Sequence, residues 1–222
     1  MNNKHKKYRL CIIFLLLNTG CAFQPLMSNS GYPINQSNKI KSWKDLNEQH
    51  IVMQEYDYSC GIASLATLLR YYFKQDITEK TLLDEIEEMF SMSEIQVIKN
   101  KGISFLELEK IARRKGYQTA SVRLHLTSLK KLSGPVLVYI EPNNYKHFAV
   151  LRGIIGDRVF LADPSRGNIR MSVHEFSKEW RGETLILGKL GFGLPKYHTL
   201  SVYHTTSFRS ELSVLREIIR IP

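Results

Sequence analysis

Hydrophobic residues recur with helical spacing in the first half of the chain. Between residues 61 and 73 they return every three or four positions, which predicts an amphipathic helix that begins at Cys60. A second helix of this kind is predicted over residues 78–90. A third begins at Ser104, where Glu107 completes a Ser-x-x-Glu capping box, and stops at Gly116. This half of the chain is therefore expected to be helical.

The second half of the chain predicts mainly strands. Its predicted elements are strands over residues 136–140, 147–154, 158–162 and 184–187, and a short helix between Ser172 and Trp180. Gly156-Asp157 separates two of these strands and is a hairpin signal. Helices followed by an antiparallel sheet give an α+β fold. The spacing of Leu212, Leu215, Ile218 and Ile219 predicts one more amphipathic helix near the C-terminus.

The N-terminus has the pattern of a secretory signal peptide. Basic residues from Lys4 to Arg9 precede an apolar run over residues 10–17, and small residues follow as far as Ala22. The run is shorter than the roughly 20 residues that a membrane-spanning helix needs. We therefore expect residues 1–22 to direct export, and we expect the protein to reside in the periplasm of a bacterial cell envelope.

Cys21 suggests a second processing step. It follows Thr19-Gly20 just past the leucine run, as the lipidated cysteine of bacterial lipoproteins does, and lipidation there would anchor the chain to a membrane. Asn18 stands where that motif prefers leucine, so ordinary cleavage after Ala22 is the alternative. In both cases we expect a flexible tether over residues 23–45, a folded domain over residues 46–190 and a C-terminal extension over residues 191–222.

Composition and charge exclude several classes of function. The 222 residues include 43% hydrophobic and 23% charged residues, as expected for one globular domain with attachments. Four of the positive charges behind the net charge of +10 lie in the predicted signal peptide, which leaves +6. No dense Lys/Arg cluster favours nucleic-acid binding, and no Gly-x-x-x-x-Gly-Lys motif indicates a nucleotide site.

Cys60 is the candidate nucleophile. Of the three cysteines, Cys11 lies in the signal peptide and Cys21 is either removed or acylated, which leaves Cys60 as an unpaired thiol in an exported chain. Free amide donors and the helix dipole at a helix start favour the thiolate over the thiol. The alternative is a buried structural cysteine, which is the more common role for a single cysteine before a helix.

A thiolate nucleophile needs a base, a group that orients the base, and donors for the oxyanion. His147 opens one strand of the predicted hairpin and Asp163 closes the other, so the two side chains can be neighbours. Gln54 lies six residues before Cys60, close enough for its amide to share an oxyanion site. Taken singly, His147 could be a polar strand end and Asp163 a turn opener. The other histidines lack metal-ligand spacing, and we expect no metal or cofactor.

Together these residues resemble a known family. Gln54, the run from Ser59 to Leu69, His147-Phe148-Ala149-Val150 and Ala162-Asp163-Pro164 are similar to the motifs of bacteriocin-processing, or double-glycine, peptidases. The resemblance covers roughly residues 49–189 and implies a papain-like fold, with N-terminal helices packed on a C-terminal antiparallel sheet. It also implies Cys60 as nucleophile, His147 as base, Asp163 as orienting group and Gln54 in the oxyanion hole. Ser59 departs from the family, since many members have Asp before the cysteine.

The resemblance implies a cysteine endopeptidase that acts on a secreted peptide or protein, with a Gly-Gly-like cleavage site. Without a nucleotide-binding motif, the chain is expected to be a stand-alone member. Its Tyr58-Ser59-Cys60-Gly61 start and the segment from Asp163 to Gly167 resemble the periplasmic peptidases of functional-amyloid secretion systems, which implies secretion-system components as partners. Two other functions stay open. The domain could bind peptides for a secretion apparatus without catalysis, or it could pass the acyl group to an amine as a transpeptidase or amidase does.

Overall fold

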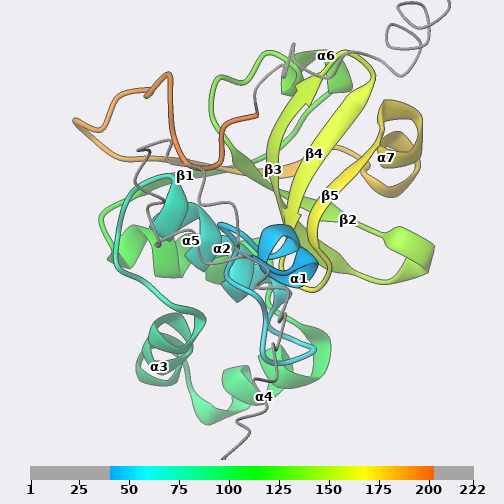
Figure 1. Ribbon diagram of the computed structural model, residues 1–222. Helices are drawn as coiled ribbons and strands as arrows, with labels where there is room; N and C mark the ends of the chain where they lie inside the picture. The colour runs from blue at the N-terminus through cyan, green and yellow to red at the C-terminus, as the bar shows by residue number, and fades with distance from the viewer. Residues whose placement is uncertain (1–40, 203–222) are drawn as a thin grey trace, which may run out of the picture. The chain divides into compact units, whose positions relative to one another are not determined.

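The computed structural model describes residues 41–202 (Figure 1). The predicted signal peptide, Cys21 and the helix predicted near the C-terminus lie outside the described residues. In chain order the elements are α1 (Trp43–Asn47), α2 (Cys60–Tyr71), α3 (Glu79–Met89), α4 (Met92–Lys101), α5 (Phe105–Arg114), β1 (Gln118–Arg123), α6 (Leu126–Leu129), β2 (Val136–Ile140), the 3₁₀ turn η1 (Pro142–Asn144), β3 (His147–Ile155), β4 (Arg158–Asp163), β5 (Gly167–Ser172), α7 (Val173–Glu179) and β6 (Glu183–Gly188).

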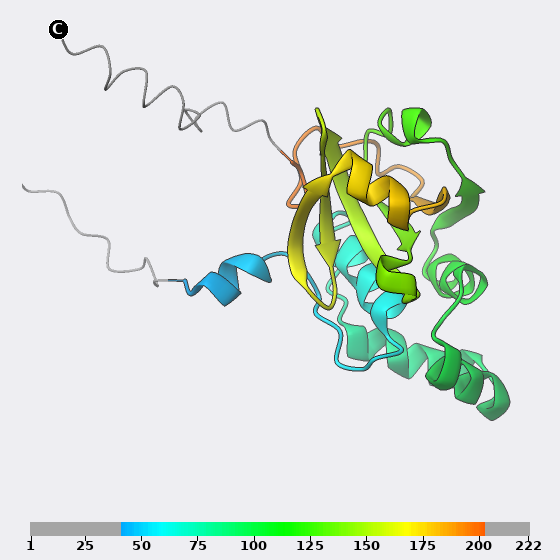
Figure 2. The ribbon, with the colours of Figure 1, turned by 90° about the vertical axis from the view of Figure 1, so that its right-hand side faces the viewer.

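The strands form one six-stranded sheet in the order β1-β6-β2-β3-β4-β5, with every neighbouring pair antiparallel. Helices α2 and α5 pack on one face of the sheet, and α7 covers part of the other (Figures 1 and 2). Helices α3 and α4 extend the helical layer beyond the sheet (Figure 1). The α+β prediction, with early helices on a later antiparallel sheet, is confirmed. None of the helices within residues 41–202 has the length and apolar character to cross a membrane.

The central strands are buried on both faces, which explains their continuous apolar runs. In β2, Leu137 points into the core shared with α2, while Val136, Val138 and Ile140 point into the core shared with α7. The same alternation holds in β3, where Phe148 and Val150 face α2. These strands fix the position of the residues at their ends, including His147.

Helix α2 is the centre of the helical layer. All ten residues from Cys60 to Leu69 are buried, although the sequence predicts only one apolar face. Its two buried hydroxyls are paired: Ser64 Oγ donates to the Phe148 carbonyl at 3.2 Å, and Thr67 Oγ1 accepts from the Val52 amide at 2.8 Å. A helix surrounded on all sides is held firmly, and its first residue is held with it.

The ends of the described region are attached to the domain. Helix α1 begins at Trp43, inside the stretch predicted as a tether, and Asn47 Nδ2 in its last turn donates to the Arg166 carbonyl at 2.8 Å. Beyond residue 190 the chain returns to the core, where Leu200 is fully buried. Arg152, the extra residue of a β-bulge in β3, donates to the Leu200 carbonyl at 3.2 Å. Packed structure therefore reaches past residue 190.

Candidate active site

Cys60 is the first residue of α2, as predicted, and it is 7% exposed. Ser59 occupies the N-cap position but makes no side-chain cap there. Its Oγ instead closes a local turn, by donating to the Tyr56 carbonyl at 2.7 Å and accepting from the Tyr56 amide at 3.2 Å. The amide donors of the first turn are thus free of a side-chain cap and surround the Cys60 sulfur with positive potential.

Gly61 allows α2 to approach the neighbouring elements closely. A Cβ on this residue would lie 2.5 Å from Ile103 Cγ2 and 3.1 Å from the Phe148 ring. A larger residue would push the start of α2 away from β3. Gly61 therefore sets the short distance between the element that carries Cys60 and the one that begins at His147.

His147 and Asp163 meet at the end of the β3–β4 hairpin. His147 Nε2 lies 3.0 Å from Asp163 Oδ1, and both side chains are almost fully buried. The prediction that they are neighbours is confirmed. Because Nε2 faces the carboxylate, Nδ1 is the ring nitrogen left for the interaction between His147 and Cys60.

The Asp163 carboxylate is held by the turn that follows it. Oδ1 accepts from the Ser165 amide at 2.9 Å, the Ser165 hydroxyl at 2.8 Å and the Arg166 amide at 3.0 Å. Oδ2 accepts from Arg166 Nε at 2.9 Å and Nη2 at 2.8 Å. Asp163 is thus both a turn residue and the partner of His147, two roles that the sequence presents as alternatives. The contribution of Arg166 was not predicted.

Burial and pairing act in opposite directions on the histidine and the aspartate. Burial lowers the pKa of His147, but the hydrogen bonds and negative charges of Asp163 and Cys60 outweigh it and raise that pKa to about 9. Burial raises the pKa of Asp163, but His147 and Arg166 outweigh it and hold that pKa well below its usual range. At neutral pH the pair is therefore an imidazolium beside a carboxylate.

This ion pair should make stability depend on pH. The folded-state pKa of His147 is raised to about 9, so its contribution is complete below the unfolded value of about 6.5 and is lost as pH rises through about 9. We expect the unfolding free energy to fall over that range by an amount on the order of a few kcal/mol. Urea unfolding at several pH values measures it. In His147→Ala the decline should be much smaller, and equal declines in both proteins would contradict the assignment.

The backbone of Gln54 is hydrogen-bonded to the turn that follows Asp163. Its backbone amide donates to the Pro164 carbonyl at 2.8 Å, and its side-chain Nε2 donates to the Tyr56 carbonyl at 3.0 Å. The amide group thus lies on the loop before Cys60, with a second N–H on Nε2. Its Oε1 is buried and receives no hydrogen bond from any described residue.

Cys60 lies where two hollows meet. One, of about 430 Å³, has apolar walls that include Ile103, Phe105 and Phe148. The other, of about 410 Å³, is lined by the loop before Cys60, the end of α4 and the loop before His147. Across this second hollow Tyr145 Oη donates to the Asp57 carbonyl at 3.3 Å. Cys60 thus borders both hollows, of which the second is the cleft at Cys60.

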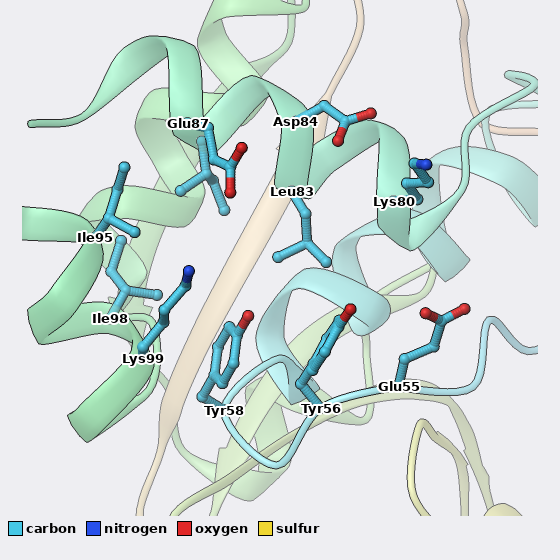
Figure 3. A pocket seen from close by; sticks show the side chains of 11 residues that line it. Glu55, Tyr56, Tyr58, Lys80, Leu83, Asp84, Glu87, Ile95, Ile98 and Lys99 are labelled. Atoms are coloured by element: carbon cyan, nitrogen blue, oxygen red, sulfur yellow. The ribbon is translucent and has the colours of Figure 1, made fainter. Parts of the chain in front are cut away.

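A separate pocket of about 380 Å³ lies between the loop over residues 55–58 and helices α3 and α4 (Figure 3). Tyr56 and Tyr58 stack on one side of it, with ring centroids 5.4 Å apart, and Leu83 points toward them from α3. Tyr58 and Lys99 line both this pocket and the cleft at Cys60. Within residues 41–202, no cluster of three or more His, Cys, Asp or Glu side chains is arranged to hold a metal ion.

The sequence and fold match known proteins over most of the described region. A model of the Peptidase C39 family matches residues 48–189. A probable functional amyloid protease, FapD, of Pseudomonas aeruginosa is 28% identical over 73% of this chain and 70% of its own length. The FapD protein of Pseudomonas fluorescens is 28% identical over 88% of this chain and 84% of its own length.

Solved structures show the same fold. A double glycine motif protease from an AMS/PCAT transporter, crystallised with its leader peptide, superposes with a TM-score of 0.51 and 29% identity, over 62% of this chain and 89% of that one. The peptidase domain of Streptococcus ComA superposes with a TM-score of 0.53 over 63% of this chain and 97% of that domain, at 22% identity.

Proposed function

The chain belongs to the Peptidase C39 family of cysteine peptidases, and we propose that it is an exported endopeptidase that cleaves a secreted peptide or protein after a Gly-Gly pair. The observation that carries the proposal is the buried ion pair between His147 and Asp163, at 3.0 Å, in interaction with Cys60 at a helix start. A structural cysteine needs no such pair beside it, whereas a cysteine nucleophile needs an oriented base.

In the proposed mechanism the Cys60 thiolate attacks the scissile carbonyl carbon and forms a C–S bond. As the tetrahedral intermediate collapses, the C–N bond breaks and the His147 imidazolium gives its proton to the leaving amine. His147 then takes a proton from water, which attacks the thioester and releases a carboxylate and the thiolate. Asp163 keeps the ring oriented and stabilises the imidazolium. The Cys60 amide and Gln54 Nε2 donate to the oxyanion.

The substrate proposal draws on the relatives. The double glycine motif protease was crystallised with its leader peptide, which supports a peptide substrate with a Gly-Gly pair. The two FapD proteins are named as probable functional amyloid proteases, which supports a substrate from an extracellular-fibre secretion system and components of that system as partners. The hollow of about 410 Å³ beside Cys60 offers space for part of such a peptide next to the sulfur.

The direct test is cleavage of defined peptides by the purified chain. A series with Gly-Gly, Gly-Ala and Ala-Ala before the same bond should give products cut after Gly-Gly, identified by mass spectrometry. Adding an amine acceptor separates hydrolysis from acyl transfer, because a transferred acyl group carries the mass of the acceptor. Binding of every peptide without any product would favour the non-catalytic module.

Export and anchoring are also part of the proposal. We expect labelled palmitate on the wild-type chain produced in bacteria, and we expect the label to vanish in Cys21→Ser, because the thiol of Cys21 is the proposed attachment site. Fractionation of the same cells measures whether both proteins cross the inner membrane. A wild-type chain that crosses without label would contradict lipidation and leave a soluble periplasmic protein.

A further inference from the structure

Three lysine side chains surround the cleft at Cys60. Lys99 and Lys101 lie in the last turn of α4, and Lys146 directly precedes His147 on another wall. All three are exposed, and none lies within 4.0 Å of a carboxylate in the part of the chain that the structure describes. The wall of the cleft therefore carries positive charge that the protein itself leaves unpaired.

The carboxylates near these lysines are few or already engaged. Asp57 is the one acidic residue among those that line the same hollow, and it is exposed. In the adjoining apolar hollow, Glu107 caps the start of α5 and Glu183 pairs with Arg123 at 3.5 Å. The cleft thus keeps a net positive charge next to the nucleophile.

Helix capping explains only part of this arrangement. Lysines in a last turn interact favourably with the helix dipole, which accounts for Lys99 and Lys101. Lys178 occupies the same position in α7, on the other face of the sheet. Lys146 is in no helix, yet it lines the same hollow as the other two. Like charges that line one hollow repel each other, so capping does not explain their convergence.

The neighbouring pocket has the opposite character. Glu55, Asp84 and Glu87 line it together with Lys80 and Lys99, so acidic side chains outnumber basic ones there (Figure 3). Its carboxylates disfavour an anionic group there, whereas the lysines favour one in the cleft at Cys60. An anionic group is therefore favoured in the cleft at Cys60 over this pocket.

We propose that the cleft selects peptides that carry Asp or Glu beside the scissile bond, and that Lys99, Lys101 and Lys146 bind these carboxylates. This specificity rests on the proposed peptidase function. An exposed lysine–carboxylate pair changes an equilibrium by about twofold, so three such pairs together should favour an acidic over a neutral peptide by roughly tenfold in kcat/KM. The preference should weaken in high salt, because exposed charges are screened within about 10 Å at 0.1 M salt.

The test compares peptides that differ only in charge. Each contains the Gly-Gly pair, with Glu, Gln or Lys at the flanking positions, and kcat/KM is measured at low and high salt. We expect the order Glu, Gln, Lys for the wild-type chain, a flat profile for the triple Lys→Gln variant, and a reversed order for Lys99→Glu/Lys146→Glu. Lys178→Gln, in the last turn of α7, should keep the wild-type order, which separates a local effect from net charge.

A binding assay keeps this inference separate from the peptidase function. Anisotropy of the same labelled peptides with Cys60→Ala measures charge preference without cleavage. If no peptide is cut but Glu peptides still bind best through the lysines, the peptidase proposal falls and the charge selection stands. If Gly-Gly peptides are cut with equal kcat/KM whatever their charge, or if the triple variant keeps the Glu preference, the charge selection is wrong.

Discussion

Cys60→Ala is expected to lower kcat for peptide cleavage by at least about 10⁴-fold, because the variant has no atom that can form the thioester. The fold should persist, since alanine suits the start of a helix and the lost sulfur belongs to one small side chain. Cleavage is followed by mass spectrometry and the fold by the thermal transition. Retention of even a tenth of the wild-type rate would contradict the cysteine-peptidase mechanism.

The matched control lies in the same helix. Thr67→Ala removes the hydroxyl that accepts from the Val52 amide at 2.8 Å, and should cost about 1–3 kcal/mol of stability. Thr67 lies two turns from Cys60. At temperatures below its thermal transition, the Thr67→Ala variant should therefore have a kcat near that of the wild type. A large loss of activity in Thr67→Ala as well would attribute the Cys60→Ala result to a disturbed helix.

Asp163→Asn is the second change with a large expected effect. Removal of the negative charge withdraws support from the imidazolium and from the ring orientation of His147, so kcat should fall by about 10²- to 10⁴-fold. The pKa of His147 should also fall from about 9 toward its ordinary value, because burial then acts with less opposition. Histidine NMR titration measures that pKa directly, apart from any effect on activity.

Asp163→Asn will also loosen the turn, since its carboxylate accepts from both Ser165 and Arg166. Ser165→Ala is the control for this effect, because it removes one donor at 2.8 Å and leaves the contact with His147 in place. It should lose stability and keep most of the activity. If both variants lose activity equally, Asp163 acts as a turn residue only. If His147→Ala is inactive and Asp163→Asn fully active, the site is a Cys–His dyad.

The elements that the sequence predicts correctly are those with the most apolar side chains in the core. The continuous run in β2 and the apolar spacing in α2 come from positions in the core, where side-chain chemistry leaves few alternatives. Strands β1 and β5 were missed because they are the edge strands of the sheet. In β1 only Ala120 and Val122 are apolar, and in β5 Ile169 and Met171 alternate with polar residues over too few positions to stand out. Strands this short offer at most two apolar positions each, which is a weak signal for a period of two.

Helix α4 was missed although a signal for it exists. Ser91 and Glu94 form a capping box of the kind that marks the start of α5 and of α7 in the sequence. Within α4 only Ile95 and Ile98 are buried, so the apolar stripe is too narrow for a period to be recognised. A search for capping boxes independent of hydrophobicity would have found this helix.

The pairing of His147 with Asp163 was predictable because hairpin geometry follows from the Gly156-Asp157 turn. The hydrogen bond from Arg166 to the Asp163 carboxylate was not predictable, because it depends on the path of the chain after Pro164. The lysines at the cleft were equally hidden. Lys99 and Lys146 are far apart in sequence and line the same hollow only because α4 ends beside the loop before β3. Tertiary proximity of this kind has no local signature.

Cys60, the proposed nucleophile, lies in the helical layer, and His147, its proposed base, lies in the sheet, 87 residues later in the chain. Contacts that close so long a loop carry a large entropic cost, and folds rich in them form slowly. A chain in which α2 has formed but β3 has not yet joined the sheet has a thiol without its histidine. Hydrolytic capacity should then arise only once β3 has packed against α2, so chains without that contact would be inert toward their neighbours.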